Sequence, residues 1–279
     1  MPESWVHPVS NPLFSDLWVK KMEQEDHRKP TALGTPFRFS DALKCPRALA
    51  FTALGVSESD PMDAAGLHVT SIGTWLHEQI QEAIGLKYPG AKFELASGND
   101  FISGSCDGLT AVGGYEGEKG LMLLEIKSVS NYPFNKAIGL SGMGWKAKRI
   151  DPDGPSQSHI VQTALNAYFH EADTCVLIYV AKEAMSANVA DRVGFGLYDR
   201  FLAEWHIPKD VWLPLAEEEI ARVGVVQARL PEIPNGMGWD DKKGWVSTNP
   251  YDNSPHYACG FCNFRTTCKA YTDGVDVLP

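Results

Sequence analysis

The sequence predicts an α/β fold with a mixed β-sheet flanked by helices. Three observations support this class: a helical hydrophobic pattern over residues 70–85, strand-like runs over 92–129, and a further helix and strand over 157–181. A helix, a three-strand meander, a helix and a strand in this order are typical of α/β proteins. The 279 residues are 44% hydrophobic and 22% charged, which is the composition of a folded globular protein.

The N-terminal part is predicted to be helical where it is structured. A short helix is expected over residues 13–24. Ser40 can cap a helix that runs to residue 51, and Pro46 places Cys45 at the start of that helix or at a break in it.

Hydrophobic periodicity defines the central elements. The helix over 70–85 is predicted from apolar residues spaced three and four apart, namely Ile72, Trp75, Leu76, Ile80 and Ile84. Strands separated by Gly, Asn and Glu turns are expected over 92–95, 101–109 and 120–129. A helix over 157–172 and a buried strand over 175–181 follow.

The remaining segments are assigned from composition. Residues 131–155 are rich in Gly, Lys and Pro and are predicted to form a long loop, of the kind that is often functional. Edge strands are expected over 192–205, an amphipathic helix over 210–229 and irregular structure over 231–257. We therefore divide the chain into an N-terminal helical segment, a core, and a C-terminal helix with a cysteine segment, over 1–69, 70–207 and 208–279.

The charge balance restricts the classes of partner. With 25 Lys+Arg against 35 Asp+Glu the net charge is −10, which disfavours broad, non-specific phosphate binding but leaves room for a local basic groove. No apolar run approaches the roughly 20 residues that cross a bilayer, so no membrane partner is expected. The N-terminus lacks the pattern of a secretory signal, and the expected location is the cytoplasm.

Two acids and a lysine form the sharpest local motif. In the strand LMLLEIKSV, alternation places Glu125 and Lys127 on one face, with apolar neighbours on the other. Asp107 ends the preceding strand at GSCDGL, where a turn could bring it beside Glu125. Two such carboxylates are ligands for Mg²⁺ or Mn²⁺, and the lysine could orient a metal-bound water. The alternative is a cross-strand Glu–Lys pair on a solvated sheet face.

Two helices carry further candidates. His77 borders the core-facing stripe of its helix and is either a core residue or a third metal ligand, whose nitrogen would favour Mn²⁺. His159, Gln162 and Asn166 are spaced to share one helix face, which either faces the active site or is exposed to solvent.

Six cysteines raise the question of metal binding. Cys106 and Cys175 lie in strand-like runs and are predicted to be core residues. Without a secretory signal, disulfides are not expected. The other four are Cys45, Cys259, Cys262 and Cys268.

The sequence CGFCNFRTTC has the spacing C-x2-C-x5-C, which indicates metal binding in a cytosolic protein. Three cysteines need a fourth ligand, and spacing leaves two open. His256 would complete a zinc site of the Cys₃His type. Cys45 would complete four thiolates for an iron–sulphur cluster.

Taken together, the motifs resemble the RecB-type PD-(D/E)XK nucleases that carry an iron–sulphur cluster. That group includes the CRISPR-adaptation exonuclease, AddB-type nuclease domains and phage-encoded exonucleases. The resemblance spans roughly residues 40 to 270 through SDALKCPRALAF, GTWLHEQIQEAI, GSCDGL, LLEIKSV, HIVQTALNAYF and CGFCNFRTTC.

The resemblance implies a restriction-endonuclease-like core whose N- and C-terminal segments are joined by a [4Fe–4S] cluster on Cys45 and the C-terminal trio. Mg²⁺ or Mn²⁺ would be held by His77, Asp107, Glu125 and the carbonyl of Ile126. Lys127 would position the attacking water, and Gln162 is the helix glutamine of the family.

Two positions depart from the family pattern. Cys106 stands where the motif has proline. The family's tyrosine usually lies four residues after the glutamine, where this chain has Asn166. Tyr168 is two residues further on, and around the helix axis it points roughly 160° away from the direction of that tyrosine.

The function implied is metal-dependent DNA exonuclease activity in recombination, repair or replication, on single-stranded DNA or duplex ends. The product would carry a 5′-phosphate. Lys136, Lys146, Lys148 and Arg149 are candidates for contact with the DNA backbone. A homo-oligomer or a recombination or replication protein would be a further partner. The alternatives are a non-catalytic DNA-binding or scaffold protein on a nuclease fold, and a zinc-knuckle interaction module.

Overall fold

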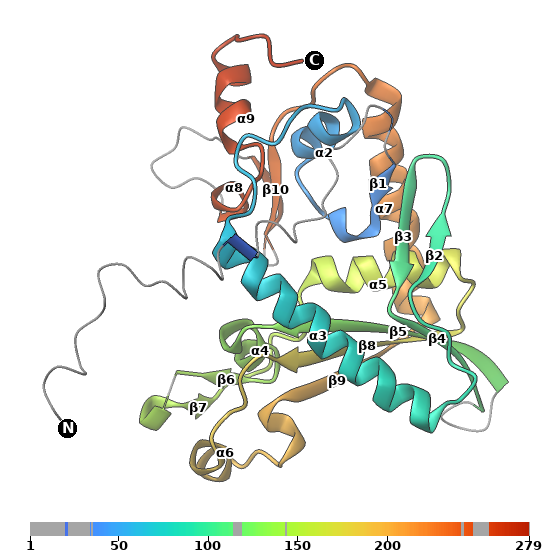
Figure 1. Ribbon diagram of the computed structural model, residues 1–279, viewed down its shortest axis with the longest axis vertical. Coiled ribbons are helices and arrows are strands. Elements are labelled where there is room, and N and C mark those ends of the chain that lie inside the picture. Colours follow the sequence, from blue (N-terminus) through green and yellow to red (C-terminus); the bar gives the residue numbers. More distant parts are fainter. Residues whose placement is uncertain are drawn as a thin grey trace, which may run out of the picture.

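A computed structural model provides the structure of residues 20–21, 34, 36–113, 119–142, 144–240, 243–247 and 257–278. Figure 1 shows a central sheet with helices α5 and α7 on one side of it and α3 crossing the other. Of the helix predicted over 13–24, only residues 20 and 21 are described, and both are helical. Among the described helices none is long and apolar enough to span a membrane.

The central sheet has the strand order β4-β5-β8-β9. Its strands are β4 (Gly108–Gly113), β5 (Lys119–Val129), β8 (Thr174–Ala181) and β9 (Leu202–Pro208). β5 and β8 are parallel, whereas β4–β5 and β8–β9 are antiparallel. The crossover between the parallel strands contains α5 (Gln157–Phe169), as parallel pairing requires. The predicted mixed α/β class is confirmed.

Side-chain alternation along β5 and β8 divides the core into two layers. Leu123 and Leu177 pack on one face, under α5 and α7 (Lys209–Arg229). Leu124 and Ile126 pack on the other, against apolar residues of α3 (Ala64–Lys87). Glu125 and Lys127 have the parity of Leu123, so they face α5 rather than α3.

Helix α3 begins earlier than its hydrophobic pattern predicts. Asp63 caps it, and Asp63 Oδ1 accepts a hydrogen bond from Gly66 N at 2.8 Å. Gly73 is the buried residue of this helix, and a Cβ there would lie 2.7 Å from Ser128 Oγ. A side chain at position 73 would displace the Ser128 hydroxyl, so the glycine allows α3 to approach β5 closely, and the approach brings the next turn, with His77, to the sheet.

The prediction of one continuous meander over 92–129 is wrong. Three strands form a separate sheet of order β1-β3-β2: β1 (Phe37–Arg38), β2 (Leu95–Gly98) and β3 (Ile102–Cys106). β4 and β5 belong to the central sheet instead, so the chain changes sheets at Asp107, between β3 and β4. Local alternation cannot reveal this change, because it identifies strands and not their partners.

The long loop predicted over 131–155 is also wrong. It contains α4 (Asn131–Ala137), β6 (Leu140–Ser141), the 3₁₀ turn η3 (Gly144–Lys146) and β7 (Lys148–Arg149). Phe134 and Ala137 are buried, so α4 packs on the core although the segment is rich in Gly, Lys and Pro. Gly139 and Gly142 have φ of 83° and 80°, a left-handed conformation that makes the tight turns around β6 possible.

Two further segments differ from their predictions. Of the edge strands expected over 192–205, the structure keeps only the start of β9. The preceding residues form α6 (Ala187–Val193) and the 3₁₀ turn η4 (Tyr198–Arg200). The segment expected to be irregular over 231–257 contains the hairpin β10 (Met237–Asp240) and β11 (Gly244–Ser247).

The N- and C-terminal parts of the chain meet on the helical side of the molecule. After the 3₁₀ turn η2 (Phe39–Asp41), Cys45 is the N-cap of α2 (Pro46–Ala53), so of the two places predicted for it the structure has the helix start. The start predicted for this helix at Ser40 is wrong, because Ser40 lies within η2 and residues 42–45 are not helical. Figure 1 shows α2 beside the C-terminal helices α8 (Tyr257–Gly260) and α9 (Arg265–Thr272). Phe51 and Phe264 are in contact, with ring centroids 5.6 Å apart, in a small apolar cluster between these helices.

Candidate active site

The candidate site lies along the edge of β5 that β4 leaves uncovered. β4 begins at Gly108, which pairs with Leu124. The next residues of β5 face Asp107 rather than a continuing strand. The motif predicted from sequence is therefore assembled at the point where the chain changes sheets.

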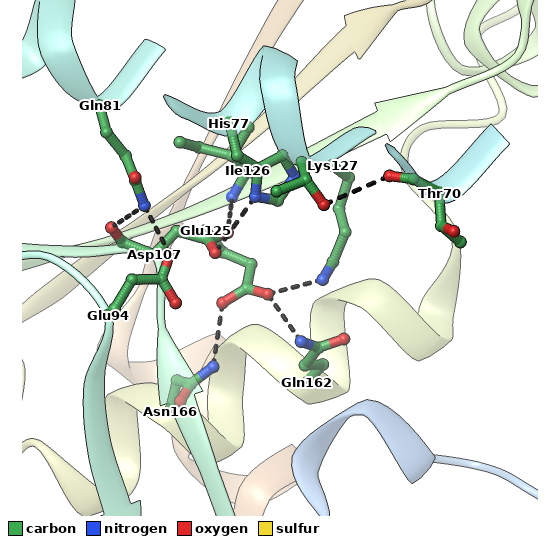
Figure 2. Close-up of polar contacts among 11 residues, drawn as sticks. Thr70, His77, Gln81, Glu94, Asp107, Glu125, Ile126, Lys127, Gln162 and Asn166 are labelled. Atoms are coloured by element: carbon green, nitrogen blue, oxygen red, sulfur yellow. Dashed lines mark hydrogen bonds and ion pairs between the residues drawn. The ribbon is translucent and has the colours of Figure 1, made fainter. Parts of the chain in front are cut away.

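Asp107 is fixed from two sides (Figure 2). Its Oδ2 accepts a hydrogen bond from the backbone N–H of Ile126 at 2.6 Å, which satisfies a donor on the uncovered strand edge. Its Oδ1 lies 3.4 Å from Nδ1 of His77 on α3. The two side chains are 13% and 25% exposed, so the pair remains accessible from solvent. The structure thus brings two predicted metal ligands, His77 and Asp107, into contact.

Gln81 also belongs to this cluster and was not identified from the sequence. Its Nε2 donates to the carbonyl oxygen of Asp107 at 2.9 Å and to Oε1 of Glu94 at 2.7 Å. Gln81 lies one helical turn after His77 on α3, so the i, i+4 spacing from the histidine could have indicated it.

Glu125 is the centre of the second half of the site. It is 1% exposed, and its two oxygens accept three hydrogen bonds. Oε1 accepts from Lys127 Nζ at 2.6 Å and from Gln162 Nε2 at 2.7 Å, while Oε2 accepts from Asn166 Nδ2 at 2.9 Å. The polar face of α5 is therefore turned toward the site. Of the two alternatives that the helical spacing left open, this is the one facing the active site and not the one exposed to solvent.

Asn166 occupies the position, four residues after Gln162, where the nucleases that the sequence resembles have a tyrosine. It is buried, and its amide reaches Glu125 directly. Tyr168 is 38% exposed and packs its ring edge-on against Phe169 at 5.3 Å between centroids. Tyr168 is therefore on the exposed side of α5, and Asn166 is one of three residues that donate to the Glu125 carboxylate.

Burial shifts two titratable groups beside Lys127 in opposite directions. Burial raises the pKa of Glu125 to about 7, against the ammonium of Lys127, which lowers it, and together with the charge of Asp107, which raises it. Burial also lowers the pKa of His159 to about 4, and the ammonium of Lys127 acts in the same direction. His159 Nδ1 lies 2.6 Å from the hydroxyl of Tyr179, which itself accepts from Ser156 N.

The raised pKa of Glu125 predicts how stability depends on pH in protein without added divalent metal. Between about pH 4.5 and 7 the unfolded chain releases the Glu125 proton while the folded protein keeps it. The contribution of Glu125 to the free energy of unfolding therefore falls as pH rises, by at most about 1.4 kcal/mol per pH unit for one proton. We expect Glu125→Gln to gain stability relative to the wild type over this window.

His159 acts in the opposite sense, because the unfolded chain binds its proton below about pH 6.5 and the folded protein does not. Because the two contributions oppose each other, the pH dependence of the free energy of unfolding of the wild type alone would show neither of them clearly. Denaturant unfolding of the wild type and Glu125→Gln at pH 4.5, 6 and 7.5 measures the difference. A constant difference across these pH values would contradict a raised pKa for Glu125.

Four cysteines converge at a second place, between α2 and the C-terminal helices. The pKa of Cys262 is raised to about 11, chiefly by burial and in part by the neighbouring thiols of Cys45, Cys259 and Cys268. Cys106 and Cys175 are free thiols buried in the core, as predicted. His256, the alternative fourth ligand, lies outside the described residues.

Arg47 contacts this thiol group and was not identified from the sequence. Its Nη1 lies 3.3 Å from Cys268 Sγ, its Nε donates to Pro234 O at 3.2 Å, and its guanidinium lies 5.6 Å from the centre of the Tyr271 ring. Arg47 therefore connects α2 to α9 next to a sulphur atom that it can polarise.

The loop before Cys45 is fixed by a buried acid on α7. Glu219 Oε1 accepts from Leu43 N at 3.0 Å and from Arg222 at 2.6 Å, and Arg222 Nη1 donates to Lys44 O at 3.2 Å. Leu43 has φ of 58°, a conformation that costs a non-glycine residue energy. These contacts hold the loop in that conformation and so determine the direction in which Cys45 enters α2.

Within the described residues no group of three or more His, Cys, Asp or Glu side chains stands in an arrangement that could hold a metal ion. In the active-site cluster the carboxylate oxygens contact protein donors instead: Lys127, Gln162 and Asn166 at Glu125, and Ile126 N at Asp107.

No protein-family model matches the chain, and no curated protein matches it. Solved structures that resemble it include the protein SSO0001, at 17% identity and a TM-score of 0.44 over 93% of this chain and 97% of that one. An alkaline exonuclease from Laribacter hongkongensis has 12% identity and a TM-score of 0.39 over 76% and 93%. A phage-related exonuclease from Haemophilus somnus 129PT has 12% identity and a TM-score of 0.36 over 71% and 95%. All three TM-scores are below 0.5, so we draw nothing about activity from them.

Proposed function

We propose that this protein is a metal-dependent DNA exonuclease of the PD-(D/E)XK type. The observation that carries the proposal is the environment of Glu125. A buried carboxyl group with a raised pKa contacts the lysine two residues on and lies beside Asp107 at an uncovered strand edge. Buried acids with perturbed pKa values next to a specific charge partner are typical of catalytic sites.

Carboxylate oxygens and an imidazole are donors that suit a hard divalent cation, although in the described residues they contact protein groups and do not surround an ion site. Asp107 and Glu125 are close enough for the charge of one to raise the pKa of the other, and a cation between them would remove this repulsion. A carboxylate has about four acceptor positions, of which three are used at Glu125, so one is left for a ligand. His77, Asp107, Glu125 and the carbonyl of Ile126 would hold Mg²⁺ or Mn²⁺. Such an ion polarises a phosphate and lowers the pKa of a bound water.

The chain's own residues would act around that centre. The ammonium of Lys127, 18% exposed, would hold the attacking water and stabilise negative charge on the phosphate. Gln162 and Asn166 orient the Glu125 carboxylate through their amides, and Gln81 fixes the backbone of Asp107. The aspartate is thereby held at a fixed position relative to the lysine.

The four converging cysteines support a second part of the proposal, a [4Fe–4S] cluster on Cys45, Cys259, Cys262 and Cys268. Four sulphur ligands and no histidine are what such a cluster needs. The cluster would hold the two ends of the nuclease domain together.

The test is hydrolysis of end-labelled DNA by the protein, with single strands and duplexes and with Mg²⁺ and Mn²⁺ supplied separately. We expect release of 5′-phosphorylated products from linear DNA only when a metal is present, and no loss of circular DNA. Protein that binds DNA but hydrolyses none with either metal would be a non-catalytic binding protein on this fold, and the proposal would be wrong.

His77→Ala is expected to reduce hydrolysis more with Mn²⁺ than with Mg²⁺, because the imidazole is the nitrogen ligand whose presence favours Mn²⁺. The measurement is the ratio of initial rates of variant and wild type in each metal. His68→Ala, on the same helix α3, serves as the control and should leave both rates unchanged. An equal loss in both metals would show that His77 does not determine the metal preference.

A further inference from the structure

Beyond the carboxyl ends of β5 and β8, exposed aromatic side chains and lysines lie on the elements between Asn131 and Arg149. We call the following residues the lysine–aromatic surface: Tyr132, Lys136, Trp145, Lys146 and Lys148. In Figure 1, α4, β6 and β7 lie together past the ends of these strands, next to α6. Tyr132 follows Lys127 by only five residues, because α4 begins two residues after β5 ends.

The two aromatic rings of this surface are unusually open to solvent. Tyr132 is 72% and Trp145 is 80% exposed. Each has a lysine over its ring: Lys136 Nζ is 5.4 Å from the centre of Tyr132, and Lys146 Nζ is 5.1 Å from the centre of Trp145. A large ring kept out of the core and paired with a cation presents an apolar, flat face and a positive charge at the same place.

The charge of this segment differs from that of the whole protein. Residues 131–149 contain three lysines and one arginine and no acid, in a chain of net charge −10. Lys146 and Lys148 are exposed, while Lys136 lies 3.5 Å from Asp153. The surface therefore offers local positive charge where an acidic protein would otherwise repel a polyanion.

Two arginines hold this surface rigidly on α6. Arg149 donates to the carbonyl oxygens of Val193 and Gly194, both at 2.6 Å, and Arg192 donates to Gly144 O at 2.6 Å. Arg149 of the β6–β7 hairpin thus bonds to the end of α6, and Arg192 of α6 bonds back to the loop that carries Trp145. A stacking surface that is already rigid loses little conformational entropy when a ligand binds.

We propose that the lysine–aromatic surface binds the single-stranded part of the DNA substrate, with bases stacked on Tyr132 and Trp145 and phosphates against Lys146 and Lys148. This inference rests on the proposed function and specifies its substrate. A single strand is the occupant that fits, because only unpaired bases expose faces for stacking, whereas a duplex offers mainly its backbone. Tyr132 follows Lys127 by five residues in the sequence, so a strand stacked on Tyr132 would approach β5 from its carboxyl end, where Lys127 lies.

The test measures binding apart from hydrolysis, by fluorescence anisotropy of a labelled 20-nucleotide single strand and of the matching duplex, without divalent metal. Tyr132→Ala and Trp145→Ala should each weaken single-strand binding about tenfold and leave duplex binding unchanged. Tyr132→Phe and Trp145→Phe should keep most of the affinity, because they keep a stacking ring. Trp75→Ala, an exposed aromatic on α3, is the matched control and should have no effect.

The salt dependence of binding and the affinity of a double variant complete the test. Lys146→Met and Lys148→Met should each reduce the slope of log binding constant against log salt concentration for the single strand by roughly 0.7.

Unchanged single-strand affinity in the Tyr132→Ala/Trp145→Ala double variant, or an equal loss for duplex, would overturn the inference. If that occurs while the wild type hydrolyses DNA, the proposed function stands and only the binding surface is wrong. Absence of hydrolysis with a single-strand-specific loss of binding would overturn the nuclease proposal instead.

Discussion

Lys127→Met is expected to lower the rate of DNA hydrolysis roughly 10²–10⁴-fold, the range that positioned proton-transfer groups contribute. Methionine keeps most of the length of the side chain and removes the ammonium that would hold the attacking water. The fold should remain, because the neighbouring Glu125 already has a pKa near neutrality and can take up a proton when its counter-charge is gone. The measurement is the initial rate on end-labelled DNA in saturating Mg²⁺ or Mn²⁺.

Lys87→Met, at the exposed end of α3, is the control for the loss of one positive charge and should be fully active. Circular dichroism and denaturant unfolding should give the same fold for both variants. Hydrolysis by Lys127→Met within a few-fold of the wild type would remove Lys127 from the active site, and with it the assignment of the Glu125–Lys127 motif.

The corresponding change at Glu125 must be conservative. Alanine would leave the buried amide of Asn166, the half-buried amide of Gln162 and the ammonium of Lys127 without their acceptor, at a cost of about 1–3 kcal/mol for a fully buried group. Glu125→Ala would then lose activity and stability together, and the two effects could not be separated. Glu125→Gln removes the charge and keeps one oxygen to accept from Lys127 and Gln162. Its new NH2 group can donate to Asn166 Oδ1, which has no hydrogen-bond partner among the described residues, once the Asn166 amide turns over.

Sequence periodicity predicted the parts of the site that lie within single elements. The alternation of LMLLEIKSV correctly separated Glu125 and Lys127 from Leu124 and Ile126, because a strand has an invariant period of two. The helical spacing of Gln162 and Asn166 placed both on one face of α5. Which face of α5 contacts the sheet depends on tertiary packing, and periodicity alone left that open.

The parts that periodicity could not predict are those in which short segments find distant partners. β1 and β7 have two residues each, and no pattern of two residues indicates a pairing register. The change of sheet at Asp107 depends on which strands pair and not on the strands themselves. Gln81 was missed because its role is visible only once the chain turn at Asp107 is placed beside α3.

The largest effect on stability is expected from the four cysteines that converge between α2 and α9. If they hold one iron–sulphur cluster, Cys45→Ala should bleach anaerobically purified protein as completely as Cys262→Ala, although the two are 217 residues apart in sequence. A link across a loop of this length is worth on the order of 5 kcal/mol in chain entropy, and metal-binding free energy adds directly to folding free energy. The measurements are visible absorbance, iron and acid-labile sulphide content, and unfolding in denaturant.

Cys175→Ala is the matched control, since Cys175 is a free thiol buried in β8 away from the other four. It should keep colour, iron and sulphide. His256→Ala should also keep them, because four thiolates already fill the ligand positions. Limited proteolysis of Cys45→Ala should release the segment that contains α8 and α9 first, since only a small apolar cluster around Phe51 and Phe264 and a few part-exposed hydrogen bonds with Arg47, Ser59 and Asp60 would then hold it. A colourless wild type that contains one zinc, lost on His256→Ala and retained on Cys45→Ala, would contradict the cluster. The thiol group would then be a zinc site of the C-terminal segment alone, and the two ends of the domain would be held by packing.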